Sequence, residues 1–194
     1  MLNVKKKIFP ELKNNNYNDL MYDEEGLWSI THPEYSDSIT KTILKYSSSD
    51  SHIVDLTAGC GGNLISFGKY FNNVTGIEID KNRFNILQNN INVYNLNINL
   101  INDDCINYLD KNYDIYFIDP PWGGPNYKYD NHLKLYLGDL EISDIINKIP
   151  KDENKLIVLK IPYNYNYDYI KIKFNILSVE KYNNIIILYF KLQS

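Results

Sequence analysis

Residues 119–125 read Asp-Pro-Pro-Trp-Gly-Gly-Pro and directly follow a short apolar run. The carboxylate of Asp119 can accept a hydrogen bond from an aromatic amine and orient the nitrogen lone pair toward an electrophile. Trp122 offers a face for a planar cation, a contact that contributes about 0.5–2 kcal/mol. Pro120 and Pro121 fix φ and remove two N–H donors, which stiffens the loop. This segment predicts chemistry on the exocyclic amine of a flat base.

A second site is predicted at residues 55–63, which read Asp-Leu-Thr-Ala-Gly-Cys-Gly-Gly-Asn. Its glycines permit positive φ and close approach of a ligand. The spacing matches neither the dinucleotide fingerprint nor a P-loop, which disfavours a phosphate cradle. Asp55, Glu78 and Asp104 end three successive apolar runs, and this suits S-adenosylmethionine, with its sulfonium and ammonium. Asp55 would bind the ammonium, Glu78 the ribose diol and Asp104 the adenine amine. The competing interpretation is that these acids cap helices.

The pattern along the chain predicts the elements that position both sites. Strands are expected at residues 53–57, 74–79, 98–101, 115–118, 155–161, 174–179 and 185–190. Helices are expected at residues 33–46, 64–70, 81–94, 106–109 and 140–149. Alternating strands and helices predict an α/β fold, a Rossmann-like, mainly parallel seven-stranded sheet with one antiparallel strand and helices on both faces. A turn at Asn183-Asn184 would make the last two strands an antiparallel edge.

The N-terminal part differs from the rest. Residues 1–32 are polar and rich in Asn, and we expect an arm with at most a short helix that contributes to the ligand pocket. Residues 33–194 would form the catalytic domain. The two regions give one domain with an extension.

Composition limits the possible partners. The 194-residue chain has a net charge of −4, so a broad electrostatic grip on DNA is not expected. No apolar run could span a bilayer, no signal peptide is visible, and Cys60 and Cys105 lack metal-ligand spacing. We expect an intracellular monomer without metal or membrane contact.

Four segments together resemble the trimethylguanosine synthase family of class I methyltransferases. Residues 25–31, Glu-Gly-Leu-Trp-Ser-Ile-Thr, resemble its E-G-W-[FY]-S-V-T segment. Residues 54–63 resemble its V-D-x-F-x-G-x-G-G-N loop, and residues 89–94 its N-N-A-x-V-Y-G helix. Residues 120–127 match P-P-W-G-G-P-x-Y, the most specific of the four.

The resemblance implies methyl transfer from S-adenosylmethionine, by a direct in-line step, to N2 of the 7-methylguanosine cap of RNA. One or two methyl groups would be added, and S-adenosylhomocysteine would be released. The implied catalytic residues are Asp119, Pro120 and Trp122. The implied cofactor residues are Ser29, Thr31, Asp55, Thr57, Gly59, Gly61, Asn63, Glu78, Asp80, Asp104 and Asp119. The implied substrate residues are Trp122, Asn90, Tyr127, Pro121 and Tyr163.

Two substituted site positions depart from the family pattern. Animal members carry serine where Asp119 stands. The family also has an arginine for the cap phosphates at the position of Tyr163, which cannot supply that charge. Lys160 or the cluster at residues 5–7 could compensate.

Two other functions stay open at this point. An N6-adenine methyltransferase acting on DNA or RNA is favoured by Asp119 and opposed by the acidic charge. A cap-binding module without activity would require a broken cofactor loop, and residues 55–63 look intact. Trp28 could serve either as a second stacking aromatic or in the core.

Overall fold

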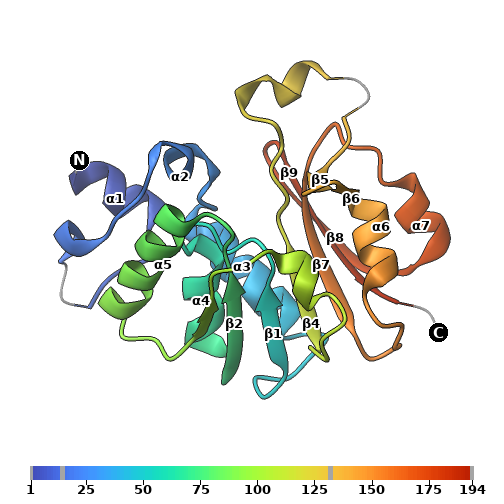
Figure 1. The fold of residues 1–194 in the computed structure, drawn as a ribbon, viewed down its shortest axis with the longest axis horizontal. Helices are drawn as coiled ribbons and strands as arrows, with labels where there is room; N and C mark the ends of the chain where they lie inside the picture. The colour runs from blue at the N-terminus through green and yellow to red at the C-terminus, as the bar shows by residue number, and fades with distance from the viewer. Residues whose placement is uncertain (1, 14–15, 131–132, 193–194) are drawn as a thin grey trace. The chain divides into compact units, whose positions relative to one another are not determined.

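The computed structural model describes residues 2–13, 16–130 and 133–192. Its main sheet has the strand order β3-β2-β1-β4-β7-β9-β8, and β9 is antiparallel to both of its neighbours (Figure 1). The predicted mainly parallel seven-stranded sheet with one antiparallel strand is confirmed. The chain divides into two compact units, residues 1–104 (unit 1) and 105–194 (unit 2), which are described in turn.

Unit 1 contains three parallel strands and the helices that connect them. The strands are β1 (His52–Asp55), β2 (Asn73–Ile77) and β3 (Asn99–Ile101). The helices are α1 (Leu2–Ile8), η1 (Tyr17–Asp19, 3-10), α2 (Glu24–Ser29), α3 (Pro33–Ile43), α4 (Gly62–Tyr70) and α5 (Lys81–Val93). Local signals set the helix starts: Pro33 occupies the first turn of α3, and the Asp80 carboxylate accepts from the N–H of Arg83 at the start of α5.

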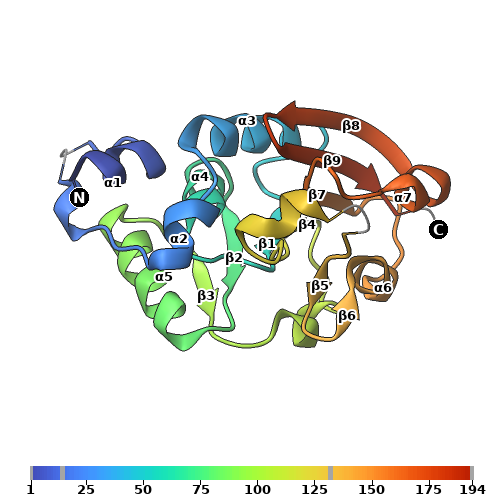
Figure 2. The ribbon, with the colours of Figure 1, turned by 90° about the horizontal axis from the view of Figure 1, so that it is seen from above.

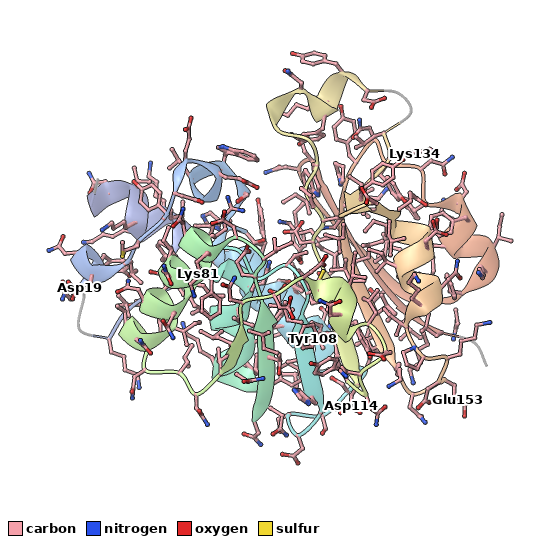
Figure 3. The ribbon with its side chains drawn as sticks, in the orientation of Figure 1. Asp19, Lys81, Tyr108, Asp114, Lys134 and Glu153 are labelled. Atoms are coloured by element: carbon pink, nitrogen blue, oxygen red, sulfur yellow. The ribbon has the colours of Figure 1, made fainter. Side chains whose placement is uncertain are left out.

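The expectation of an arm with at most a short helix is wrong. Residues 2–32 contain α1, η1 and α2, and the side chains of Phe9, Leu12, Tyr17 and Leu20 are buried. Their irregular spacing within a polar sequence gives no helical period, so the pattern conceals them. The arm lies against α5, where the Asn89 side chain donates to the carbonyl of Asp19 at 2.7 Å (Figure 3, which labels Asp19 and Lys81, the first residue of α5).

Unit 2 contains the other four strands of the main sheet and a small hairpin. The main strands are β4 (Ile115–Ile118), β7 (Leu156–Pro162), β8 (Asn175–Tyr182) and β9 (Ile185–Lys191), and β4 is parallel to β7. The helices are η2 (Cys105–Tyr108, 3-10), η3 (Pro125–Tyr129, 3-10), α6 (Ile142–Lys148) and α7 (Asp168–Lys173). The hairpin of β5 (Tyr136–Leu137) and β6 (Leu140–Glu141) lies beside α6 (Figure 2).

The last two strands form an antiparallel pair at one edge of the main sheet, as expected from the sequence. β9 lies between β7 and β8, and β8 is the outer strand. The burial of the two strands agrees, since β9 is buried along its middle whereas most of β8 is partly exposed. The turn between them is at the predicted place, where Asn183 has φ +49°. Among the described residues, no helix is both long and apolar enough to cross a bilayer.

Candidate active site

The glycine loop of unit 1 is shaped by its own first acid. Asp55, the last residue of β1, is buried, and its Oδ1 accepts from the N–H of Thr57 at 3.0 Å and its hydroxyl at 3.4 Å. Gly59 and Gly61 have φ of +55° and +98°, values that a residue with a Cβ rarely adopts. The chain therefore turns sharply after β1, and α4 begins at two glycines, Gly61 and Gly62, whose backbone carries no Cβ.

Glu78 joins the end of β2 to this loop. Its buried carboxylate accepts from the N–H of Gly59 at 2.9 Å and from the N–H of Asp80 at 2.8 Å. Burial raises the pKa of Glu78, and these two hydrogen bonds oppose the shift. A carboxylate has about four acceptor sites, so two hydroxyl groups of a ligand can still bind to it. The geometry suits a ribose diol.

Asn63 supplies a buried acceptor near the start of α4. Its Nδ2 donates to Thr31 Oγ1 at 3.0 Å, while its Oδ1 has no donor among the described residues. The arm packs closely here, since a Cβ on Gly62 would lie 2.9 Å from the side chain of Ile30. An unpaired buried oxygen costs about 1–3 kcal/mol, so a ligand N–H at this place would remove a penalty. This open acceptor thus fits an ammonium group, which donates hydrogen bonds.

The aromatic platform of unit 2 consists of Trp122 and Tyr127, beside Asp119 at the end of β4. The two rings pack edge to face, with centroids 5.1 Å apart and planes at 76°. Gly123 and Gly124 have φ of +84° and +77°, and no heavy atom comes within 4 Å of where their Cβ atoms would be. Trp122 Nε1 is buried without an acceptor in the part of the chain that the structure describes.

The acid of this platform is ion-paired. Lys160 Nζ lies 2.6 Å from Asp119 Oδ2, and the same ammonium lies 5.4 Å from the centroid of the Trp122 ring. Burial raises the pKa of Asp119, and the positive charge of Lys160 opposes that shift. The sequence-based suggestion that Lys160 serves cap phosphates is therefore wrong, because its buried ammonium is directed at Asp119.

The sequence model described as RNA cap guanine-N2 methyltransferase matches residues 50–193. The chain belongs to this family. It is an S-adenosylmethionine-dependent methyltransferase, as the resemblance of its motifs implied. The glycine loop and the aromatic platform lie within the matched residues, whereas the arm precedes them.

Two individual proteins and a solved structure are similar to this chain. An uncharacterised protein of Acanthamoeba polyphaga mimivirus is 33% identical over 190 residues, covering 84% of this chain and 74% of that protein. Trimethylguanosine synthase of Schizosaccharomyces pombe is 32% identical over 137 residues, covering 62% of this chain and 56% of its own length. The solved structure of a tRNA methyltransferase from M. jannaschii has 18% identity and a TM-score of 0.57, covering 83% and 49% of the two chains, and supports the fold.

Asn90 of this methyltransferase has a different environment from the substrate-binding one expected. It is 0% exposed, its Oδ1 accepts from the N–H of Met21, and its Nδ2 donates to the carbonyls of Met21 and Cys60. Both atoms of its amide are engaged in these hydrogen bonds, so the buried side chain is not available to a cap nucleotide. We correct its role to a clamp that joins the arm, α5 and the glycine loop.

The remaining predicted cofactor residues differ in their exposure and in their contacts. Asp80 caps α5, which is the alternative considered for such acids. Thr57 and Asp104 are partly exposed, and Ser29 is exposed at the last residue of α2. Trp28 is 54% exposed, which excludes the core role considered for it.

Sequence reasoning missed the network around Arg83. This side chain lies 2.9 Å from Asp23 Oδ2 and 2.6 Å from Glu25 Oε2, so it fixes α2 to α5. Asp23 Oδ1 also accepts from the N–H of Gly26 at 2.6 Å and from Cys60 Sγ at 3.6 Å. Arg83 is the one arginine of the chain, and that rarity was an available signal.

Asn164 was missed as well. Its Nδ2 donates to the carbonyls of Tyr127 and Asp130, both at 2.8 Å, so it holds η3 against the end of β7. The neighbouring Tyr163 is half exposed, and its position near Tyr127 contributes to a raised pKa of the Tyr127 hydroxyl, whose main cause is burial. These contacts order the rim of the platform.

Proposed function

We propose that this methyltransferase acts on N2 of the 7-methylguanosine cap of RNA, giving the N2-methyl product and, after a second transfer, the N2,N2-dimethyl product. The observation that carries the proposal is the platform of unit 2, where a carboxylate and an edge-to-face aromatic pair occur on one short loop. The family match supports the choice of guanine N2.

On the substrate side, the platform supplies two kinds of recognition. The face of Trp122 stacks on the base, and a 7-methylated guanine is cationic, so it binds an indole more strongly than neutral guanine does. The carboxylate of Asp119 accepts a hydrogen bond from N2 and turns the nitrogen lone pair toward the methyl donor. Tyr127 supports the indole from its side, while Pro121 and Tyr163 border the base.

On the cofactor side, unit 1 supplies acceptors that match S-adenosylmethionine. Glu78 would hold the ribose diol, and the unpaired Asn63 Oδ1 would accept from the ammonium, with Asp55 nearby on the same loop. Residues 1–32 would contribute Thr31, whose hydroxyl already fixes Asn63. When bound, the cofactor supplies an electrophilic methyl group on a sulfonium.

The chemistry needs positioning more than proton transfer. The N2 lone pair forms the new N–C bond as the S–C bond breaks, and the bonding pair leaves with sulfur in neutral S-adenosylhomocysteine. N2 then loses one proton to water. Holding the two reactants in line can contribute about 7–11 kcal/mol to lowering such a barrier.

Mass spectrometry of reaction products tests the proposal. The chain is incubated with S-adenosylmethionine and, separately, 7-methyl-GTP, GTP, m7G-capped RNA and adenine-containing oligonucleotides of DNA and RNA. We expect methyl groups on N2 of the 7-methylated substrates and none on GTP. Methylated adenine with unmodified caps would establish the N6-adenine alternative that Asp119 also suits, and binding of caps without any turnover would establish a non-catalytic module.

A further inference from the structure

The pairing of β4 with β7 brings an acid and a lysine together at the end of the apolar strands. The last registered pair is Ile118 with Leu159, so Asp119 and Lys160 follow it on the two parallel strands. Every residue of β7 is buried, and the side chain of Lys160 is 5% exposed. Lys160 therefore places an ammonium in a strand that is otherwise suited to the core.

Stability alone does not explain this lysine. Removing two charges from water costs several kcal/mol per ion, and a buried pair often returns less than it costs. The other ion pairs of unit 2 that the structure describes, Lys111 with Asp110 and Lys171 with Asp168, have side chains at least half exposed. A buried pair at a ligand platform is a functional candidate for that physical reason.

The same ammonium also contacts the indole. Lys160 Nζ is within cation–π range of Trp122 while it bonds Asp119 at 2.6 Å. A single group thus fixes both the hydrogen-bond acceptor and the stacking surface of the platform. A carboxylate that accepts one such bond keeps further acceptor sites for an amine.

We propose that Lys160 is a positioning residue that holds the Asp119 carboxylate in its ionised form beside the ring of Trp122. The inference rests on the proposed function, because an ionised Asp119 accepts from N2–H, whereas a protonated one presents its own O–H to that amine. Among the described residues, the other buried lysine of unit 2, Lys155, directly precedes β7 and instead donates to Asn112 and to the carbonyl of Tyr113. Lys128 is directed at the ring of Tyr127.

Carbon-13 NMR of the aspartate carboxyl groups tests this without requiring activity, with the Asp119 signal assigned by its loss in Asp119→Ser. In Lys160→Met we expect the Asp119 titration midpoint to rise by at least about one pH unit, since an opposite charge within about 4–6 Å shifts a carboxyl pKa by 1–3 units. Lys160→Arg should restore most of the shift. An unchanged midpoint in a folded Lys160→Met protein would overturn the proposal.

Kinetics provide the second readout. In Lys160→Met, the acid limb of the pH profile of kcat for methyl transfer should move to higher pH, in step with the NMR midpoint. The same substitution in an Asp119→Ser background should leave the acid limb at its pH. A limb that moves equally in both backgrounds contradicts the proposal. Lys155→Met, which removes an equally buried lysine directly before β7, is the matched control and should leave the Asp119 titration unchanged.

Two further results separate the possible failures. If Lys160→Met does not fold, Lys160→Gln, which removes the charge but keeps a polar side chain, replaces it: the Asp119 midpoint should rise in the same way, and an unchanged midpoint would count against the pair. If no methyl transfer to 7-methylguanosine occurs, the proposed function fails, while the NMR midpoints still decide whether Lys160 controls Asp119.

Discussion

The side-chain amide of Asn90 pairs with the main chain of Met21 through two hydrogen bonds of 2.8 Å, one accepted by Oδ1 and one donated by Nδ2. The same Nδ2 also donates to the carbonyl of Cys60 at 2.9 Å. One side chain of α5 is thereby the hydrogen-bond partner of both main-chain groups of Met21 in the arm and of one carbonyl of the glycine loop.

Replacing Asn90 should therefore loosen the arm. In Asn90→Ala the part-buried N–H and carbonyl of Met21 and the buried carbonyl of Cys60 lose their partner, at a cost of about 0.5–1.5 kcal/mol per hydrogen bond. We expect lower stability in urea and faster amide hydrogen exchange over residues 17–31. Asn85→Ala, an exposed position on the same helix, is the control and should leave both measurements close to wild type.

Arg83→Met should open the arm at α2, because Asp23 and Glu25 lose their shared partner. Burial raises the pKa of the Cys60 thiol to about 12, so the native thiol is neutral as well as covered. We expect faster alkylation of Cys60 by iodoacetamide, followed by peptide mass spectrometry, with buried Cys105 of unit 2 as the internal reference. The partly exposed ion pairs are worth about 1 kcal/mol or less each, and salt should weaken them. Equal alkylation of Cys60 in both proteins would show that Arg83 does not hold the arm.

Glu78→Gln should weaken cofactor binding. A glutamine has one acceptor oxygen for Gly59, Asp80 and the ribose, so we expect at least about tenfold weaker binding of S-adenosylhomocysteine by calorimetry. The wild-type affinity should also fall as the pH drops through the raised pKa of Glu78, because the protonated group accepts less well. The variant should lack that dependence, and a parallel decline in both proteins would assign it to another group.

The same group affects stability in a defined direction. Its pKa is raised in the native state, so between the ordinary value of 4.5 and the raised value the folded chain binds more protons than the unfolded chain. The free energy of unfolding contributed by Glu78 therefore decreases as pH rises through this interval. Urea unfolding across the interval should show a smaller decrease in Glu78→Gln than in wild type.

Trp122→Ala should separate substrate recognition from cofactor binding. Stacking of a base on an aromatic side chain is worth about 1–3 kcal/mol, so kcat/KM for 7-methyl-GTP should fall about 10–100-fold. Binding of S-adenosylhomocysteine should stay within about twofold, since its predicted ligands other than Asp119 are in unit 1. Trp122→Phe should retain part of the activity. Full activity in the alanine variant would refute the stacking role.

Most elements of the fold could be predicted, and the exceptions have physical causes. The runs at 115–118 and 155–161 are strands because continuous apolar segments suit a buried parallel sheet. The order of the last two strands also had a signal: residues 185–190 are apolar on both faces, as an inner strand requires, whereas 175–182 alternate with Ser, Glu and Lys.

The site residues were predictable where chemistry requires a residue type, and less so where a residue acts through others. The glycine loop and the Trp122 platform carry their chemistry in short local motifs. Asn90 and Arg83 act through partners about 60–70 positions away in the chain, and one sequence contains no record of such pairs. Lys160 is detectable in the sequence, because a lysine inside an apolar strand must have a buried partner.

The register that sets Asp119 opposite Lys160 also constrains how such a site can evolve. A lineage with serine at this position would have to acquire the acid first, since a carboxylate with 18% of its side chain exposed retains some hydration, whereas an ammonium at 5% does not. A buried lysine at position 160 is tolerated only after the acid is present. From then on, replacing the acid alone would leave the buried ammonium without its partner. The two positions should therefore be inherited as a pair.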